Sequence, residues 1–226
     1  MKQNSDSIKK GNSKILIVDD HPVVRQGLAQ LINQSPGLAV CAEAENALDA
    51  MGHIEKYKPD LVVLDLSLGK SSGLTLLTSL KSRFSRLHVL VLSVHDESIY
   101  AERVLRQGAK GYIMKKAASE TVIEAIHKVL SGDIYLSSEM KDKLIHKMIG
   151  AGTVNDRTPI DTLTNREIEV YQFVGQGMPT REIADKLHLS VKTVETYLAR
   201  IKDKLHIANS RELIMHAMQW VQKTNP

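Results

Sequence analysis

The sequence predicts an α/β protein in which a doubly wound parallel sheet of the (βα)5 type precedes a small all-helical domain. Two observations lead to this fold class. In residues 14–131, short apolar runs alternate five times with helical patterns, which is typical of right-handed βαβ crossovers that cover a sheet on both faces. From residue 161 onward, only helical patterns occur, and very short turns join them.

The strands and helices of the first part follow in strict order. We expect strands near 14–18, 38–43, 61–65, 88–93 and 111–114, and helices near 22–33, 46–57, 72–82, 98–107 and 119–131. The run 61–65 (LVVLD) is apolar throughout until its last residue, as expected of a strand buried on both faces. Pro22 suits the first turn of a helix, and Gly108 suits the end of one.

The second part is expected to contain four helices, near 165–175, 181–187, 191–206 and 209–222. Thr164 with Glu167 forms a predicted capping box, and Thr180 and Ser190 are the predicted N-caps of the next two helices. We therefore expect a disordered tail at 1–13, a first domain at 14–133, a linker at 134–160 with one helix near 140–149, and a second domain at 161–226.

Charge and cysteine content limit the possible functions. The chain of 226 residues has 30 basic and 26 acidic residues, and residues 161–226 carry nine against eight. Because no segment is strongly basic, any nucleic-acid binding must depend on where charges are placed locally. Cys41 is the single cysteine, so there is no internal disulfide. No apolar run approaches a membrane span, and no signal peptide is recognisable, so a cytoplasmic protein without a membrane partner is expected.

Polar side chains follow the predicted strands at their carboxyl ends, the edge where open α/β sheets bind ligands. They are Asp19, Asp20, Asp65, Ser93 and Lys115. Gathered carboxylates can bind Mg²⁺, and an aspartate can also attack phosphorus to form an acyl phosphate. Taken singly, the residues have simpler readings: Asp19 or Asp20 could cap the following helix, and Lys115 could be a solvated surface lysine.

Residues 14–131 resemble the receiver domain of two-component response regulators. The resemblance runs through 18–22 (VDDHP), 64–66 (LDL), 92–93 (LS) and 112–115 (YIMK). It implies a flavodoxin-like fold in which Asp65 accepts phosphate from a sensor histidine kinase or a small acyl-phosphate donor. It further implies that Ser93 and Lys115 contact the phosphate, that Ser93 and Tyr112 form a switch pair, and that Mg²⁺ is held by Asp19, Asp20, Asp65 and the backbone carbonyl of Ser67.

One departure from the receiver pattern lies directly after the predicted acceptor. Receivers commonly carry Met-Pro-Gly there, whereas this chain has Leu68, Gly69 and Lys70. The rigid proline is missing and a cation is added, while each predicted catalytic group is retained. This departure keeps open an alternative in which the receiver serves only as a dimerisation module and DNA binding is independent of phosphorylation.

Residues 163–213 resemble the LuxR-type helix-turn-helix domain, through 163–170 (LTNREIEV), 182–184 (EIA) and 190–197 (SVKTVETY). Together with the receiver, this is similar to the NarL/FixJ class. The resemblance implies that the helix at 191–206 enters the major groove of double-stranded DNA and that the last helix contributes to a homodimer. The predicted DNA contacts are Lys192, Thr193, Glu195, Thr196, Ala199, Arg200, Lys202 and Lys204.

Glu195 departs from the relatives that carry lysine at this position. A glutamate can accept a hydrogen bond from cytosine N4 in the major groove. It can equally pair with a neighbouring lysine or arginine, so both readings stay open. One face of the helix at 191–206 is apolar at helical spacing and should pack inward. The residues of this face are Val194, Leu198, Ile201 and Leu205. Periodicity alone would favour an amphipathic helix in an ordinary four-helix bundle.

The sequence thus predicts a response-regulator transcription factor, not an enzyme, in which phosphorylation of Asp65 controls dimerisation and DNA binding. One alternative is the phosphorylation-independent regulator described above. The other is a phosphohydrolase that turns over through an aspartyl phosphate. The attached helix-turn-helix and the absence of a recognisable substrate-binding cap argue against the phosphohydrolase.

Overall fold

The computed structural model describes residues 11–68, 71–117, 119–150 and 159–224. These form two compact units. One comprises the chain up to residue 94 together with 104–136, and the other comprises 95–103 together with the chain from 137. Most of the tail expected at 1–13 lies outside the described residues, and Ser13 already opens the first strand. Residues 151–158 of the expected linker also lie outside them.

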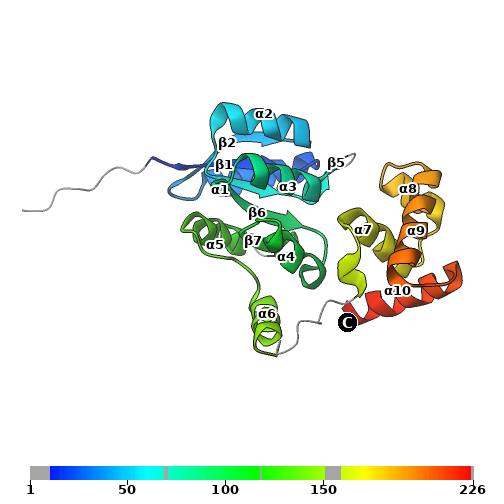
Figure 1. The fold of residues 1–226 in the computed structure, drawn as a ribbon. Coiled ribbons are helices and arrows are strands. Elements are labelled where there is room, and N and C mark those ends of the chain that lie inside the picture. Colours follow the sequence, from blue (N-terminus) through cyan, green and yellow to red (C-terminus); the bar gives the residue numbers. More distant parts are fainter. Residues whose placement is uncertain (1–10, 69–70, 118, 151–158, 225–226) are drawn as a thin grey trace, which may run out of the picture. The chain divides into compact units, whose positions relative to one another are not determined.

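The first unit is built on a parallel sheet of five strands (Figure 1). The strands are β1 (Ser13–Val18), β2 (Leu38–Ala44), β3 (Leu61–Leu64), β6 (His88–Ser93) and β7 (Gly111–Met114). Their order in the sheet is β2-β1-β3-β6-β7, which confirms the predicted doubly wound sheet. In this order the direction of winding reverses between β1 and β3, and ligands of open α/β sheets bind at such a reversal.

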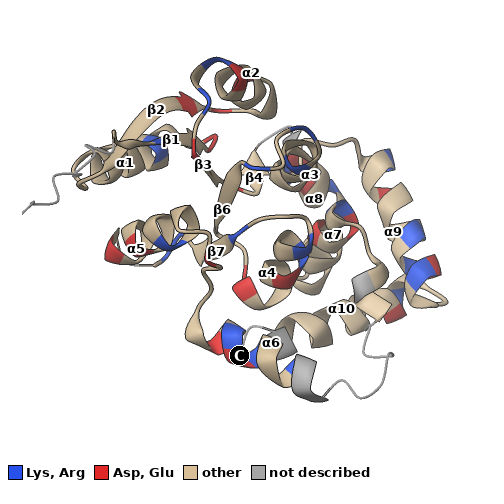
Figure 2. Cartoon of the chain, turned by 60° about the vertical axis from the view of Figure 1, so that its left-hand side comes forward, with Lys and Arg blue, Asp and Glu red and all other residues tan. Residues whose placement is uncertain are grey.

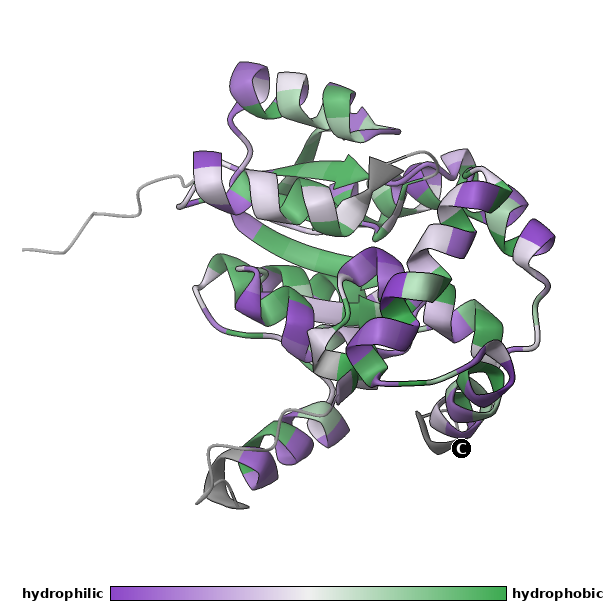
Figure 3. Ribbon diagram, turned by 45° about the vertical axis from the view of Figure 1, so that its right-hand side comes forward, coloured by the Kyte–Doolittle hydropathy of each residue, from purple (hydrophilic) through white to green (hydrophobic). Residues whose placement is uncertain are grey.

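Helices alternate with the strands as predicted. They are α1 (Pro22–Asn33), α2 (Ala47–Tyr57), α3 (Gly73–Arg83), α4 (Glu97–Arg106) and α5 (Ser119–Leu130). On one face of the sheet, Leu28 and Ile32 of α1 and Ile126 of α5 pack against buried strand residues that include Ile17 and Val63. Right-handed crossovers place α2 and α3 on the opposite face. The strands are correspondingly apolar along their length (Figure 3).

A short antiparallel hairpin, which the sequence did not predict, follows β3. It consists of β4 (Ser67–Leu68) and β5 (Ser71–Ser72), with Ser67 opposite Ser72 and Leu68 opposite Ser71. Gly73 comes next, and its N–H donates to the Leu66 carbonyl at 3.0 Å. Backbone pairing therefore holds Ser67 and Leu68, whereas Gly69 and Lys70 of the departure from the receiver pattern lie outside the described residues.

The second unit is helical. Besides most of α4, it contains α6 (Ser138–Gly150), a 3-10 turn η1 (Pro159–Thr162), α7 (Asn165–Gly175), α8 (Thr180–Lys186), α9 (Val191–Leu205) and α10 (Ser210–Thr224). The four helices predicted after residue 161 and the helix predicted near 140–149 are confirmed. No helix in the described ranges is long and apolar enough to cross a bilayer.

The predicted helix caps are largely confirmed. Thr164 and Glu167 form the capping box of α7, and the Ser190 hydroxyl accepts from the Thr193 N–H at the start of α9. The prediction for Thr180 was wrong, because Pro179 is the N-cap of α8 and Thr180 is the first helical residue. The ring of proline fixes φ near −65°, which is close to the −64° observed for Pro179. Pro179 can therefore precede the helix although it has no side chain that caps it.

Candidate functional site

Asp19 and Asp65, which were predicted to lie close together, do so at the carboxyl edge of the sheet, between β1 and β3. β1 and β3 are neighbours, with Val18 opposite Leu64, so the next residues, Asp19 and Asp65, emerge side by side. The Asp65 N–H donates to the Val18 carbonyl at 2.8 Å, which fixes the start of the acceptor loop. Asp19 is 2% exposed and Asp65 is 1% exposed. Two carboxylates at such burial need a compensating charge.

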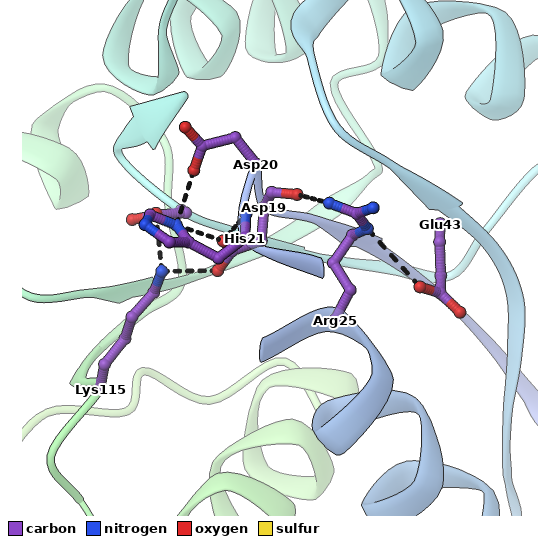
Figure 4. Close-up of polar contacts among 7 residues, drawn as sticks. Asp19, Asp20, His21, Arg25, Glu43 and Lys115 are labelled. Atoms are coloured by element: carbon purple, nitrogen blue, oxygen red, sulfur yellow. Dashed lines mark hydrogen bonds and ion pairs between the residues drawn. The ribbon is translucent and has the colours of Figure 1, made fainter. Parts of the chain in front are cut away.

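Lys115 supplies part of this compensation. Its Nζ lies 2.6 Å from Asp19 Oδ2 and 2.7 Å from Asp65 Oδ2, and Figure 4 shows it reaching toward Asp19 from the end of β7. The Lys115 N–H donates to the Ser93 carbonyl at 2.7 Å, which ties the ends of β6 and β7 together. The sequence-predicted set of Asp19, Asp20, Asp65 and Lys115 is therefore brought together.

The surroundings change the acidity of the two central groups. Burial raises the pKa of Asp65 to about 6, although the Lys115 ammonium opposes the shift. Burial acts to lower the pKa of Lys115, but the contacts with Asp65 and Asp19 outweigh it, so this pKa is raised. Lys115 thus stays protonated at neutral pH, and most Asp65 side chains are ionised there.

The raised pKa predicts a pH-dependent stability. Because folding raises the pKa of Asp65 from 3.8 to about 6, the native state binds this proton more tightly than the unfolded state. The resulting stabilisation is complete below the unfolded pKa and is lost as pH rises through the folded pKa. Between pH 4 and 7, wild type should therefore lose on the order of 2–3 kcal/mol of unfolding free energy relative to Asp65→Asn. Urea denaturation of both proteins in a chelator measures this difference, and a pH-independent difference would contradict the prediction.

The acid cluster has the donor chemistry for a hard divalent cation. Ligand atoms of Asp19, Asp20, His21 and Asp65 all lie within 4.8 Å of one another. Asp65 Oδ1 is buried and has no hydrogen-bond partner among the described residues. Such an oxygen is costly unless something pairs with it, and Mg²⁺ favours carboxylate oxygens together with water and phosphate oxygens. The residues present therefore fit the predicted cation.

The other predicted receiver residues surround this cluster. Ser93 is fully buried at the end of β6, and Tyr112 of β7 is 1% exposed, so its ring lies inside the unit. Ser67 opens the hairpin two residues after Asp65. Ser93 and Tyr112, the two residues of the predicted switch pair, are therefore both buried.

Two residues that the sequence did not single out hold Asp19 in place. The N–H of His21 donates to Asp19 Oδ1 at 2.9 Å. Arg25 Nη1 donates to the Asp19 carbonyl at 2.6 Å, and Arg25 Nε lies 3.6 Å from Glu43 Oε2 of β2 (Figure 4). The Asp19 N–H donates to the Ala44 carbonyl of β2. Asp19 is therefore fixed through its backbone and its side chain, and the run 18–22 was the only sequence signal for this arrangement.

A cavity of about 1140 Å³ opens at the opposite edge of the same sheet. Its lining includes Leu38, Asp60 and His88, which stand at or beside the amino ends of β2, β3 and β6. Asp65 follows the carboxyl end of β3, so these amino ends of the strands lie at the other edge of the sheet. The cavity therefore has no part in the acid cluster.

In the second unit, α8 and α9 form a helix-turn-helix in which α9 presents a polar outer face. Val194 and Ile201 are fully buried on its inner side, as predicted. Five of the predicted DNA contacts are exposed: Lys192, Glu195, Thr196, Ala199 and Arg200. Basic and acidic residues both occur along this helix (Figure 2). The face is therefore polar and accessible without being uniformly positive.

Lys204 has a different environment from the exposed residues of α9. Its Nζ lies 2.6 Å from Glu167 Oε2 of α7 and donates to the Thr162 carbonyl at 3.3 Å. The hydrogen bond from Lys204 helps to lower the pKa of Glu167, against the effect of burial. Lys204 therefore joins α9 to α7 within this unit, a role that the sequence prediction of a phosphate contact did not include.

The surroundings of Glu195 on α9 distinguish its two predicted roles. In the described part of the chain Glu195 has no ion-pair partner, although Lys192 lies one turn away on the same helix. Its carboxylate is exposed. The geometry thus favours a free acceptor over an internal ion pair.

Comparison with known proteins gives matches to both units. Residues 15–127 match the response regulator receiver domain, and residues 161–217 match the luxR family of bacterial regulatory proteins. The oxygen regulatory protein NreC of Staphylococcus aureus is 35% identical over 91% of this chain and 97% of its own length.

Solved structures show the same relationship. A LuxR-family two-component response regulator from Aurantimonas sp. is 30% identical, with a TM-score of 0.57 over 62% of this chain and 99% of that protein. RcsB of Salmonella enterica serovar Typhimurium, bound to the rprA promoter with the phosphomimetic BeF3−, is 25% identical, with a TM-score of 0.60 over 92% and 99%.

Proposed function

Because the chain belongs to the two-component response regulators that join a receiver domain to a LuxR-type DNA-binding domain, we propose that Asp65 is the phosphoacceptor that controls its binding to DNA. The observation that carries this proposal is the position of Asp65. Its buried carboxylate contacts Lys115 and shares one cluster with Asp19 and Asp20, and one of its oxygens is unpaired among the described residues. A structural aspartate would have both oxygens satisfied.

The proposed reaction is a single phosphoryl transfer. An ionised Asp65 oxygen attacks the phosphorus of a phosphohistidine on a sensor kinase, or of a small acyl-phosphate donor. A P–O bond forms to Asp65, the bond from phosphorus to the donor breaks, and the donor keeps the electron pair. Lys115 releases Asp65 Oδ2 and balances charge on the phosphoryl oxygens, and Ser93 donates its hydroxyl hydrogen to one of them.

The acid cluster is proposed to hold Mg²⁺ through Asp19, Asp20, Asp65 and the Ser67 carbonyl. When bound, the ion neutralises the carboxylates and the incoming phosphoryl group. The chain itself positions these ligands. Asp19 is fixed by Arg25 and by the Ala44 carbonyl of β2, and Asp65 is fixed by its N–H bond to Val18.

The DNA-contacting surface is proposed to be the outer face of α9. Lys192, Arg200 and Lys202 would contact phosphates, which fix the position of a protein on DNA without reading sequence. Glu195, with Thr196 and Ala199 beside it, would face the base edges. The exposed apolar side chains of α10, Ile214, Met215 and Met218, are 44%, 55% and 42% exposed. Such a face supports a homodimer in which two copies occupy two half-sites. The protein is proposed to act in the cytoplasm.

The proposed control is tested by the affinity for DNA before and after phosphorylation. DNA selected from a random pool by the donor-treated protein should be bound more tightly after treatment, by a factor between about 5 and 150, the usual range of coupling between two sites. Donor-treated Asp65→Asn should keep the affinity of the untreated protein.

Equal affinities with and without donor would favour the alternative in which the receiver serves only for dimerisation. Multiple turnovers of phosphate release from a small ester would favour the phosphohydrolase. Family membership argues against both alternatives.

A further inference from the structure

His21 occupies a fixed position at the edge of the acid cluster. It is the N-cap of α1, with φ of −89° and ψ of 109°, and Pro22 follows it. Its N–H donates to Asp19 Oδ1 at 2.9 Å, and its carbonyl accepts from the Arg25 N–H at 3.1 Å. Because its backbone N–H and carbonyl are both hydrogen-bonded, the backbone of His21 is fixed, and its side chain begins next to the carboxylates.

The imidazole contacts two of the acids through one nitrogen. His21 Nδ1 lies 2.8 Å from Asp20 Oδ1 and 3.2 Å from Asp19 Oδ1 (Figure 4). Two adjacent ligands of an octahedral ion with bonds of about 2.1 Å are separated by about 3.0 Å. The two distances from His21 Nδ1 are those of hydrogen bonds from the imidazole, and they also match the separation of neighbouring donors around one metal ion.

The two oxygens of each buried carboxylate are used differently. Lys115 contacts Oδ2 of both Asp19 and Asp65. Asp65 Oδ1, in a residue that is 1% exposed, has no hydrogen-bond partner within the described ranges. One carboxylate oxygen of Asp65 belongs, with a ring nitrogen of His21, to the group of ligand atoms that lie within 4.8 Å of one another. The unpaired, buried Asp65 Oδ1 is a second observation that indicates a bound cation beside His21.

We propose that His21 is a direct ligand of the metal ion at this site, through Nδ1, and that it shifts the preference of the site from Mg²⁺ toward first-row transition ions such as Mn²⁺. The inference rests on the proposed phosphoacceptor site and adds a nitrogen donor to its oxygen donors. Imidazole binds transition ions well, whereas Mg²⁺ selects oxygen ligands. The His21 side chain is 61% exposed, so an ion can reach it from solvent.

The test compares Mn²⁺ and Mg²⁺ binding by wild type and His21→Ala, using the full chain. Electron spin-echo measurements on bound Mn²⁺ should show ¹⁴N coupling in wild type and none in His21→Ala. The Kd for Mn²⁺ should rise about tenfold or more on loss of the imidazole, as metal sites respond to loss of a coordinating group or its support. The Kd for Mg²⁺ should change much less. His127→Ala removes an exposed imidazole from α5 and should leave both constants and the coupling unchanged.

The outcomes separate this inference from the proposed function. Wild type that binds both ions without ¹⁴N coupling would overturn the role of His21 and leave the phosphoacceptor site standing. Equal losses of Mn²⁺ and Mg²⁺ affinity in His21→Ala would mean that the imidazole only positions Asp19 and Asp20, and would also overturn it. Wild type that binds neither ion would overturn both the inference and the proposed metal site.

Discussion

Asp65→Asn is expected to abolish acyl-phosphate formation completely. Asparagine keeps the shape of the side chain and its place at the end of β3, but its amide is not a nucleophile toward phosphorus. Incubation with a labelled small acyl-phosphate donor, followed by detection of hydroxylamine-sensitive label, measures the effect. Because the variant removes a buried charge that burial already disfavours, it should fold at least as well as wild type at neutral pH.

Asp60→Asn provides a matched control for this prediction. Asp60 directly precedes β3, so it stands at the opposite end of the same strand, and its carboxylate accepts from the Lys14 N–H at 2.8 Å. Labelling should be unchanged in this variant. Label that survives in Asp65→Asn would exclude Asp65 as the acceptor, and equal loss in both variants would point to a structural effect.

Gly73→Ala is expected to be the most damaging small substitution near the site. A Cβ at this position would lie 2.2 Å from the Asp65 carbonyl oxygen and 2.6 Å from Leu66 Cα. Both are backbone atoms of the acceptor loop, which must move to make room. Overpacking of this kind costs roughly 1–3 kcal/mol or more, so the midpoint of thermal unfolding should fall by roughly 10 °C. Divalent-ion affinity should fall with it.

Gly27→Ala is the control for the glycine substitution. Gly27 lies inside α1, and a Cβ there would meet nothing within 4 Å. Alanine is favoured over glycine inside helices by about 1 kcal/mol, so this variant should be slightly stabilised and should bind metal as wild type does. A Gly73→Ala protein as stable as wild type would show that the loop yields easily.

The sheet and the gathering of its acids could be predicted because they depend on local patterns. Apolar runs that end in Asp19 and Asp65 identify parallel strands, and parallel strands place their carboxyl ends at one edge. The site could be predicted only in outline, because individual side chains are placed by tertiary contacts. The bond from the His21 N–H to Asp19 is a local one that a strand-end aspartate commonly makes, whereas no sequence pattern encodes the bond from the Arg25 side chain to the Asp19 carbonyl.

The same limit applies to the helical unit. The inner face of α9 follows from helical periodicity, which predicted burial of Val194 and Ile201. The ion pair between Lys204 and Glu167 joins residues 37 positions apart, so a lysine that periodicity assigns to solvent is drawn into the interior contacts. The β4–β5 hairpin was missed because two-residue strands carry no periodic signal.

The hairpin after Asp65 has a consequence for how the acceptor segment responds to its surroundings. A proline ring stiffens a chain covalently, and heat does not loosen it. Here Ser67 and Leu68 are held by cross-strand pairing with Ser72 and Ser71, and such bonds melt and re-form. Warming or mild denaturant should therefore break the β4–β5 pairing at a lower temperature or denaturant concentration than it unfolds the five-stranded sheet. The rate of phosphate acceptance by Asp65 would then depend on temperature.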